Sequence, residues 1–199
     1  MACFFNCILL TLWYLGANLW NKYQLLKEEG VIVPMFFRKA PDKQELPVNS
    51  EAIFSPVTGV VIPLEKVSDP TFAQKILGDG LAIYPEEGKI YSPVDGEVTT
   101  LTDTLHAVCL TSKQGAELLI HVGRDTVTLN GRPFTCHVKE GDKIRKGQLL
   151  LEFDLEAIDG AGLDLTTPVI VVNSDDYELV KAEQTEITPN DVLLTLRRK

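Results

Sequence analysis

The sequence predicts an all-β domain, an antiparallel β-sandwich or barrel, preceded by an apolar N-terminal helix. From about residue 50, short β-favouring runs alternate with turn signals, as they do in sandwiches and barrels. The pattern Ser-Pro-Val-x-Gly-x-Val occurs at residues 55–61 and again at residues 92–98, which indicates an internally duplicated strand-turn-strand motif. No long amphipathic helix pattern occurs in this region. A length of 199 residues suits one such domain with an extension.

The first 21 residues form the predicted apolar helix. Residues 3–20 contain no charged side chain, and this length is at the lower limit for crossing a bilayer. Lys22 and Lys27 follow the apolar run, so the positive-inside rule predicts a cytoplasmic location for the rest of the chain. The helix is therefore a candidate anchor that tethers the domain to the inner face of the membrane. A helix lying on a surface, and an N-terminus that is not the natural start, are the alternatives.

Residues 22–49 are polar and contain Pro34, Pro41 and Pro47, which predicts a linker. Residues 50–199 then form the folded domain. Within this domain we expect short helical turns at residues 71–77 and 155–161.

Composition limits the classes of partner. The formal net charge of -9 disfavours a nucleic acid, because phosphate contacts need clustered Lys and Arg side chains. An acidic surface instead favours a basic protein partner. The four cysteines form no Cys-x-x-Cys pair, which favours a reducing compartment over a disulfide framework.

Two histidines lie in neighbouring β-favouring runs. His106 and His121 flank a turn signal at residues 112–115, which predicts an antiparallel hairpin. A two-residue loop at residues 113–114 sets the histidines directly opposite each other, with Cβ atoms about 5 Å apart. A loop at residues 114–115 makes the pair diagonal on the same face. Only the intermediate register, without a compensating bulge, places the histidines on opposite faces.

The histidine pair suggests phosphoryl chemistry. A neutral imidazole nitrogen can attack a phosphoryl group, and a second histidine can donate a hydrogen bond to the phosphoryl oxygens. Thr104 lies two residues before His106, on the same predicted strand face, and its hydroxyl could fix an imidazole tautomer or bind a phosphoryl oxygen. Gly123 would allow close approach of another backbone segment. His137 has no such partner and is predicted to be structural.

A zinc site is the alternative. His106, His121 and Asp125 are ordinary zinc ligands, so spacing alone also permits a zinc-dependent peptidoglycan-type metallopeptidase. Such enzymes usually carry a later His-x-His pair, and no histidine follows His137. A biotinyl or lipoyl carrier is a further alternative, but the sequence has no Met-Lys-Met-like hairpin tip.

Several motifs together resemble a known family. Residues 115–127 resemble the active-site signature of the glucose-type IIA (EIIA) domains of the bacterial phosphoenolpyruvate-dependent sugar phosphotransferase system. Five further motifs also match sequence motifs typical of that family, in order and without large gaps. They lie at residues 78–83, 92–96, 137–142, 152–155 and 166–171. The resemblance covers about residues 50–199.

The resemblance implies a phosphoryl carrier. In such a domain, His121 matches the histidine that takes a phosphoryl group from the phosphocarrier protein HPr and passes it to a IIB domain of a sugar permease. His106 matches the supporting histidine and Thr104 the hydroxyl beside it. No resident cofactor is expected: the phosphohistidine is transient, and zinc at the two histidines would be adventitious.

The resemblance also assigns a partner-binding rim. Asp69 and Asp125 match acidic residues that meet basic side chains of HPr, and Phe72 matches part of the apolar rim around the histidines. Arg124 departs from the pattern, since the family usually has an aliphatic residue there. It could pair with Asp125, weaken an apolar docking surface or bind the phosphoryl group, so it bears on partner choice.

Overall fold

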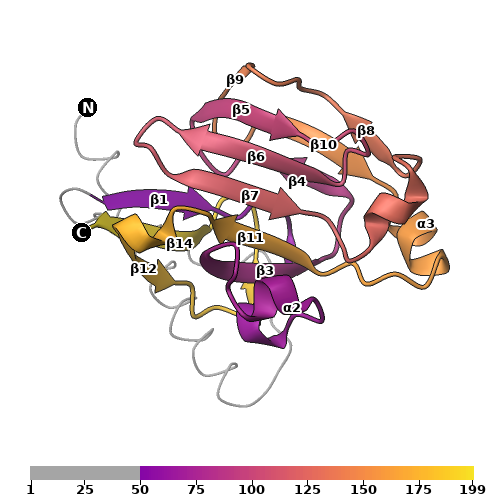
Figure 1. The fold of residues 1–199 in the computed structure, drawn as a ribbon, viewed down its shortest axis with the longest axis horizontal. Coiled ribbons are helices and arrows are strands. Elements are labelled where there is room, and N and C mark those ends of the chain that lie inside the picture. Colours follow the sequence, from indigo (N-terminus) through magenta and orange to yellow (C-terminus); the bar gives the residue numbers. More distant parts are fainter. Residues whose placement is uncertain (1–49) are drawn as a thin grey trace, which may run out of the picture. The chain divides into compact units, whose positions relative to one another are not determined.

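The computed structural model describes residues 50–199, which form an antiparallel β domain with only short helices (Figure 1). The predicted apolar helix and membrane anchor at residues 1–21 and the linker at residues 22–49 lie outside the described residues and stay predictions. The strands are β1 (Ser50–Phe54), β2 (Gly59–Pro63), β3 (Asp79–Pro85), β4 (Lys89–Tyr91), β5 (Gly96–Leu101), β6 (Ala107–Ser112), β7 (Glu117–His121), β8 (Phe134–Cys136), β9 (Lys143–Ile144), β10 (Leu149–Phe153), β11 (Thr167–Val171), β12 (Tyr177–Lys181), β13 (Glu186–Ile187) and β14 (Val192–Arg198).

The helices are single turns or little more, and both predicted helical turns are present. They are η2 (Leu64–Lys66), α2 (Pro70–Ala73), η3 (Thr126–Leu129), α3 (Leu155–Gly160) and η4 (Ser174–Asp176). Each α-helix begins after an aspartate whose carboxylate accepts a backbone N–H of the first turn: Asp69 from Thr71, and Asp154 from Ala157. None of the helices within residues 50–199 has the length and apolar character needed to span a membrane.

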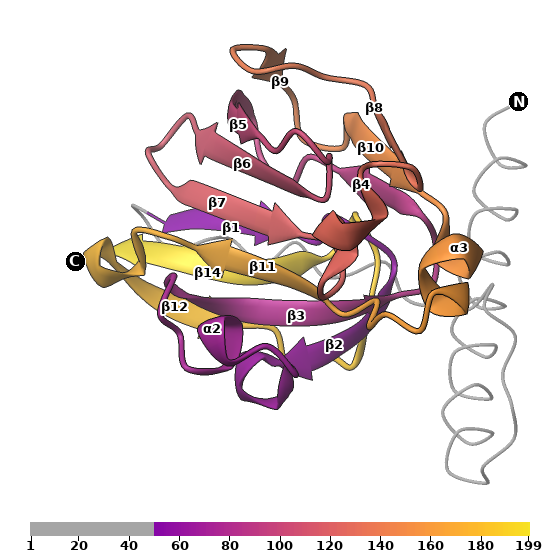
Figure 2. The ribbon, with the colours of Figure 1, turned by 45° about the vertical axis from the view of Figure 1, so that its right-hand side comes forward.

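The strands form three sheets whose order repeats. The largest sheet has the order β13-β2-β3-β11-β7-β6-β5-β9, and the smaller sheets are β1-β14-β12 and β4-β10-β8. Counted inward from the two ends of the large sheet, β13 corresponds to β9, β2 to β5 and β3 to β6. The last corresponding strands, β11 and β7, are neighbours at the centre of the sheet (Figure 2). The same relation maps β1 onto β4. All strand pairs in the described part of the chain are antiparallel, and the predicted duplication is confirmed.

The two repeats are joined by reciprocal backbone hydrogen bonds. The N–H of Phe54 donates to the carbonyl of Pro93 (3.1 Å), and the N–H of Tyr91 donates to the carbonyl of Pro56 (2.7 Å). Adding 37 to each residue of the first repeat gives its counterpart in the second. The repeats therefore face each other across a local two-fold axis.

The serine of each repeat makes the same local turn. Ser55 and Ser92 are both buried, and each hydroxyl donates over 2.7 Å to the carbonyl two residues ahead, that of Val57 or Val94. A serine hydroxyl that satisfies a nearby backbone carbonyl stabilises a turn. The Ser-Pro-Val pattern is thus a structural signal for this bend.

The large sheet has an apolar cluster on each face. The main core contains Leu118, Ile120 and Val169, together with side chains of the two smaller sheets. On the opposite face, Leu119 of β7 and Ile170 of β11 pack with a cluster that includes Phe72 of α2. Because side chains alternate along a strand, His121 shares the face of Leu119 rather than that of Ile120. The α2 helix therefore covers the face of the sheet to which His121 belongs (Figure 1).

Candidate active site

His121 ends β7 and His106 immediately precedes β6, but neither expected register of the hairpin is correct. In the β6–β7 hairpin, His121 pairs with Ala107 rather than with His106, and this is the intermediate register. The reason is a loop of three residues, 113–115, in place of two, closed by the hydrogen bond from the N–H of Ser112 to the carbonyl of Ala116. Gly115 has a left-handed φ of 93°, as the last residue of such a loop requires. Strand alternation alone would then separate the two histidines.

The two imidazoles nevertheless meet, because His106 precedes the first residue of β6. Leu105, immediately before it, has a left-handed φ of 57°, so the chain turns sharply there and strand alternation does not extend to His106. The carbonyl of His106 still accepts the N–H of Val122 (2.8 Å). The ring centroids of His106 and His121 lie 4.9 Å apart with an interplanar angle of 79°, an edge-to-face contact.

His121 has a defined proton position. Its Nδ1 lies 2.8 Å from the carbonyl oxygen of Gly123, and a carbonyl can only accept a hydrogen bond, so Nδ1 carries the proton. Burial, and secondarily the neighbouring His106, lower the pKa of His121 to about 4, against a partial opposing effect from Asp69 and Asp125. At neutral pH the ring is therefore uncharged, and Nε2 holds a free lone pair. That nitrogen is a nucleophile.

Gly123 is required by its surroundings. Its φ is 70°, in the left-handed region. A Cβ added there would lie 2.7 Å from the carbonyl oxygen of Asp164 and 2.7 Å from Cγ2 of Thr126. The close approach that the sequence predicted is therefore that of the Asp164 backbone.

His106 is held by two hydroxyls. Thr104 Oγ1 lies 2.6 Å from Nδ1 of His106, so the predicted contact is present. Its placement differs from the prediction, since Thr104 lies in a turn and not on a strand face. Thr102, which the sequence analysis missed, lies 3.3 Å from the same nitrogen and bonds both the N–H and the carbonyl of Ala107. Burial lowers the pKa of His106 as well.

Phe72 forms the apolar side of the site. Its ring centroid lies 5.3 Å from that of His121, and the residue is only 5% exposed. Pro70 at the first helical position and Asp69 as N-cap start the short α2 helix that carries it. Phe72 is therefore both part of the apolar cluster and a neighbour of His121. Asp69 is placed at the same side of the site, where its charge acts on His121.

Arg124 lies at the rim and pairs with an acidic neighbour. Its Nε lies 3.4 Å from Oδ2 of Asp125, and its Nη1 donates to the carbonyl of Ser68 over 3.1 Å. The predicted pairing of Arg124 with Asp125 is present, and the other two roles considered for Arg124 stay predictions. Asp125 has a left-handed φ of 59° and leads into η3. Arg124 thus connects the segment before α2 with the segment after β7.

The zinc alternative gains no support. Across residues 50–199, no group of three or more His, Cys, Asp or Glu side chains is placed to hold a metal ion. Zinc sites in proteins use three or four such ligands. His106 and His121 offer one Nε2 each, so adventitious zinc between them stays a prediction. His137 instead pairs with Glu152 (2.8 Å), which fits its predicted structural role.

The β-sandwich described above has a counterpart among solved structures. The glucose permease IIA from Mycoplasma capricolum matches with a TM-score of 0.70 and 31% identity, covering 73% of this chain and 95% of that one. The fold and site therefore define the class of IIA phosphotransferase domains.

Sequence comparison identifies the family. Residues 51–177 match the family described as "phosphoenolpyruvate-dependent sugar phosphotransferase system, EIIA 1", and the chain belongs to it. A glucose-specific EIIA component of Oceanobacillus iheyensis is 44% identical over 70% of this chain and 85% of its own length. EIIA components are phosphotransferase relay proteins, so the chain has the phosphoryl-carrier role of this family.

Other relatives are much longer proteins. The beta-glucoside-specific EIIBCA component of Dickeya chrysanthemi is 55% identical over 67% of this chain, and that of Bacillus subtilis is 50% identical over 73%. The chain spans 21% and 24% of the length of these two relatives, respectively.

Proposed function

We propose that Nε2 of His121 accepts the phosphoryl group from the phosphocarrier HPr and passes it to a IIB domain during sugar uptake. One observation supports this assignment above the others. The Gly123 carbonyl accepts the Nδ1 proton of His121, which leaves the nitrogen remote from Cβ unprotonated. Nδ1 of His106 contacts Thr104, so Nε2 of His106 is the nitrogen that would form a hydrogen bond with the phosphoryl group.

The transfer needs no further reagent. The Nε2 lone pair of His121 forms a bond to phosphorus as the phosphorus–nitrogen bond of the donor phosphohistidine breaks, and the donor nitrogen keeps that electron pair. The Nδ1 proton of His121 stays in place, and the positive charge that develops on the ring is stabilised by the Gly123 carbonyl. With Thr104 donating to Nδ1 of His106, Nε2–H of His106 donates to a phosphoryl oxygen.

The surroundings of His121 suit a basic partner. Asp69 and Asp125 make the electrostatic potential around the ring more negative, and the whole chain has a net charge of -9. Val127, on η3 just beyond Asp125, is 47% exposed and offers an apolar contact. Complementary charge steers such encounters, while apolar contact at the centre supplies affinity. HPr as the donor is inferred on this basis.

The recipient is inferred from the relatives. Several similar proteins are EIIBCA or EIICBA components, whose names join an A part with B and C parts. We place this domain beside a IIB domain and a sugar permease, on the cytoplasmic side of the membrane. Residues 3–20 are the candidate tether. A chain that lacks them is expected to be lost from the membrane fraction, and fusion of an unrelated apolar segment in their place is expected to restore it there.

Labelling with phosphoenolpyruvate tests the assignment. Incubation with the upstream kinase, HPr and labelled phosphoenolpyruvate is expected to place one acid-labile phosphate on the chain. His121→Gln is expected to abolish the label, while the matched control His137→Gln keeps it. His106→Gln is expected to accept phosphate and to pass it on poorly. Equal labelling of His121→Gln would reject the assignment, and full forward transfer by His106→Gln would reject the supporting role.

A further inference from the structure

The peptide unit between Gly123 and Arg124 is fixed at both ends. Its carbonyl accepts the Nδ1 proton of His121 (2.8 Å), and its N–H donates to the backbone carbonyl of Asp164 (2.8 Å). A trans peptide points these two groups in opposite directions. The His121 ring and the Asp164 carbonyl therefore lie at the two ends of one continuous hydrogen-bonded chain, in which each bond polarises the next.

Asp164 is in turn anchored by its side chain. Oδ1 accepts the N–H of Thr166 (2.8 Å), and Oδ2 accepts the hydroxyl of Ser68 (2.8 Å). These hydrogen bonds, with a smaller effect from the nearby Arg124, hold the pKa of Asp164 below its ordinary value despite partial burial, so the carboxylate is charged at neutral pH. The residue leads into β11, which pairs with β7. Asp164 is thus tied to the strand that carries His121 and to the segment before α2.

Arg124 closes the same arrangement from outside. Its guanidinium binds the carbonyl of Ser68 and the carboxylate of Asp125. Three segments, residues 67–69, 122–126 and 163–166, therefore hold one another around the carbonyl that receives the His121 proton. The sequence analysis singled out Asp69, Arg124 and Asp125 in these segments as partner-binding residues, and not as parts of this hydrogen-bonded arrangement.

We propose that Asp164 is a positioning residue, which keeps the Gly123 carbonyl against Nδ1 of His121 and so keeps Nε2 unprotonated for phosphoryl transfer. The effect on transfer rests on the proposed function of His121, but the effect on the tautomer does not. An imidazole without a fixed partner distributes its proton between both nitrogens, and a ring protonated on Nε2 cannot attack phosphorus. The anchored carboxylate removes this freedom.

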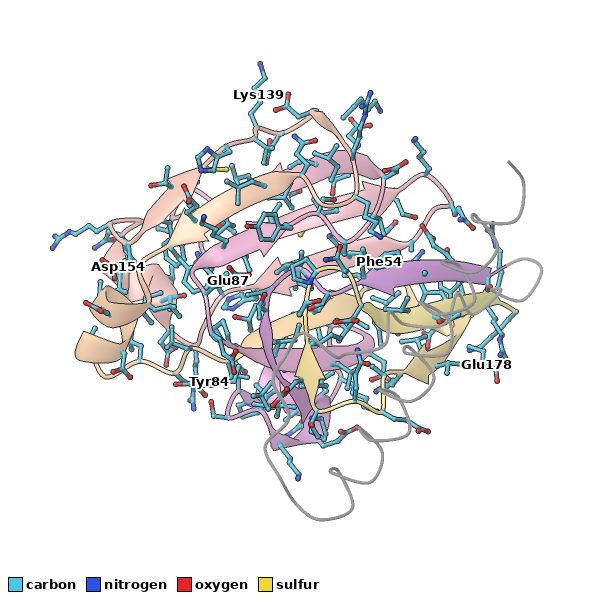
Figure 3. All side chains as sticks on the ribbon, turned by 180° about the vertical axis from the view of Figure 1, so that it is seen from behind. Phe54, Tyr84, Glu87, Lys139, Asp154 and Glu178 are labelled. Atoms are coloured by element: carbon cyan, nitrogen blue, oxygen red, sulfur yellow. The ribbon has the colours of Figure 1, made fainter. Side chains whose placement is uncertain are left out.

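A competing explanation is that Asp164 only stabilises its own turn. The chain offers a matched control in Asp154, labelled in Figure 3 at the start of α3. Its carboxylate also accepts a backbone N–H a few residues ahead, that of Ala157 (3.0 Å), and within residues 50–199 no hydrogen bond joins this carboxylate to the segments around His121. The charged and titratable groups that act on His121, namely His106, Asp69 and Asp125, are unchanged in all the variants.

The test combines nitrogen-15 NMR of the histidine rings with single-turnover phosphoryl transfer from phospho-HPr. The wild type is expected to show His121 protonated on Nδ1 alone. Asp164→Ala is expected to show a mixture of both tautomers and about tenfold slower transfer. Asp164→Asn, which keeps one acceptor oxygen, is expected to restore most of both properties, and Ser68→Ala to lose part of them. Asp154→Ala is expected to lower thermal stability but to match the wild type in tautomer and transfer rate.

Two outcomes overturn the proposal. One is an Asp164→Ala protein with the Nδ1 tautomer and the transfer rate of the wild type. The other is an equal change in Asp154→Ala, which would reduce the role of Asp164 to general stability. If Asp164→Ala does not fold, Asp164→Asn and Ser68→Ala give the same readouts. A tautomer shift in a protein whose wild type takes no phosphate supports the positioning role while rejecting the proposed function.

Discussion

Thr104 Oγ1 lies 2.6 Å from Nδ1 of His106, and it is the nearer of the two hydroxyls in contact with this nitrogen. The other nearby hydroxyl, Thr102, is already engaged with both backbone groups of Ala107. A threonine that donates to Nδ1 leaves the proton of neutral His106 on Nε2, the nitrogen proposed to meet the phosphoryl group. The tautomer of neutral His106 therefore depends on the hydroxyl of Thr104.

Thr104→Val tests that dependence. The substitution keeps the shape of the side chain and removes its hydroxyl, so His106 loses its preference for the Nε2–H tautomer. We expect His121 to be phosphorylated still, with onward transfer to a IIB domain about tenfold slower. Rapid-quench measurement of both half-reactions separates the two steps. Thr135→Val on the exposed side of β8 is the control, and onward transfer by Thr104→Val at the wild-type rate would contradict the prediction.

Arg124→Leu is expected to favour association with a basic partner. The guanidinium partly neutralises Asp125, to which it is bonded at 3.4 Å. Its removal makes the rim more acidic, so the KM for phospho-HPr should fall about fivefold, and the difference should shrink at high salt. Steady-state transfer at two ionic strengths measures this. Arg124→Lys keeps the charge and serves as the control; a higher KM for Arg124→Leu would show that Arg124 itself binds the partner.

Stability is expected to fall as the solution becomes acidic. The pKa of His121 is lowered to about 4 in the folded protein, below its ordinary value of 6.5. Between these pH values the unfolded chain binds a proton that the native ring does not, so the free energy of unfolding decreases as pH falls, by up to about 3 kcal/mol. Above about pH 6.5 this contribution to the pH dependence vanishes.

Urea unfolding at several pH values checks this contribution against His121→Gln. Burial raises the pKa of Glu51 and gives an opposite trend, but that trend is common to both proteins. The difference between the two unfolding curves therefore isolates His121. A difference that does not vary between pH 7.5 and pH 4.5 would show that the folded protein does not suppress protonation of this ring.

The repeat predicts matched losses of stability. Ser55 and Ser92 are buried and make the same 2.7 Å hydrogen bond to the carbonyl two residues ahead. Ser55→Ala and Ser92→Ala should each lower the free energy of unfolding by about 1 kcal/mol. Urea unfolding of the two variants and of the double variant gives these values. If one substitution costs several times more than the other, the two turns are not energetically equivalent.

Much of the fold follows from local patterns in the sequence. The repeat at residues 55–61 and 92–98 correctly predicted two related units. The pattern is informative because each serine stabilises its bend through a contact within the same short motif. Both short helices were predictable from a proline or an acidic cap near their start. The strand pairings between distant segments, such as β3 with β11, depend on tertiary packing that spacing along the chain does not reveal.

The site was predicted in part for reasons that the structure corrects. His106 and His121 do meet, yet through the left-handed backbone of Leu105 and not through the expected register. A positive φ at leucine has no clear sequence signal, because the surrounding structure imposes it. Ser68 and Asp164 were missed for a similar reason, since their contact spans 96 positions. A serine and an aspartate in isolated loops are common surface residues, and nothing local marks them as neighbours.

The pairing of the first described strand with the last affects how this domain can be used in longer proteins. Ser50 of β1 lies opposite Arg197 of β14, so the described chain begins and ends at the same end of this sheet. His121 lies on a different sheet from these two strands. A fusion partner can accordingly be attached at either end with the same reach to the histidine, and the order of parts in a transporter polypeptide is free to change while the phosphoryl-carrying surface keeps its geometry.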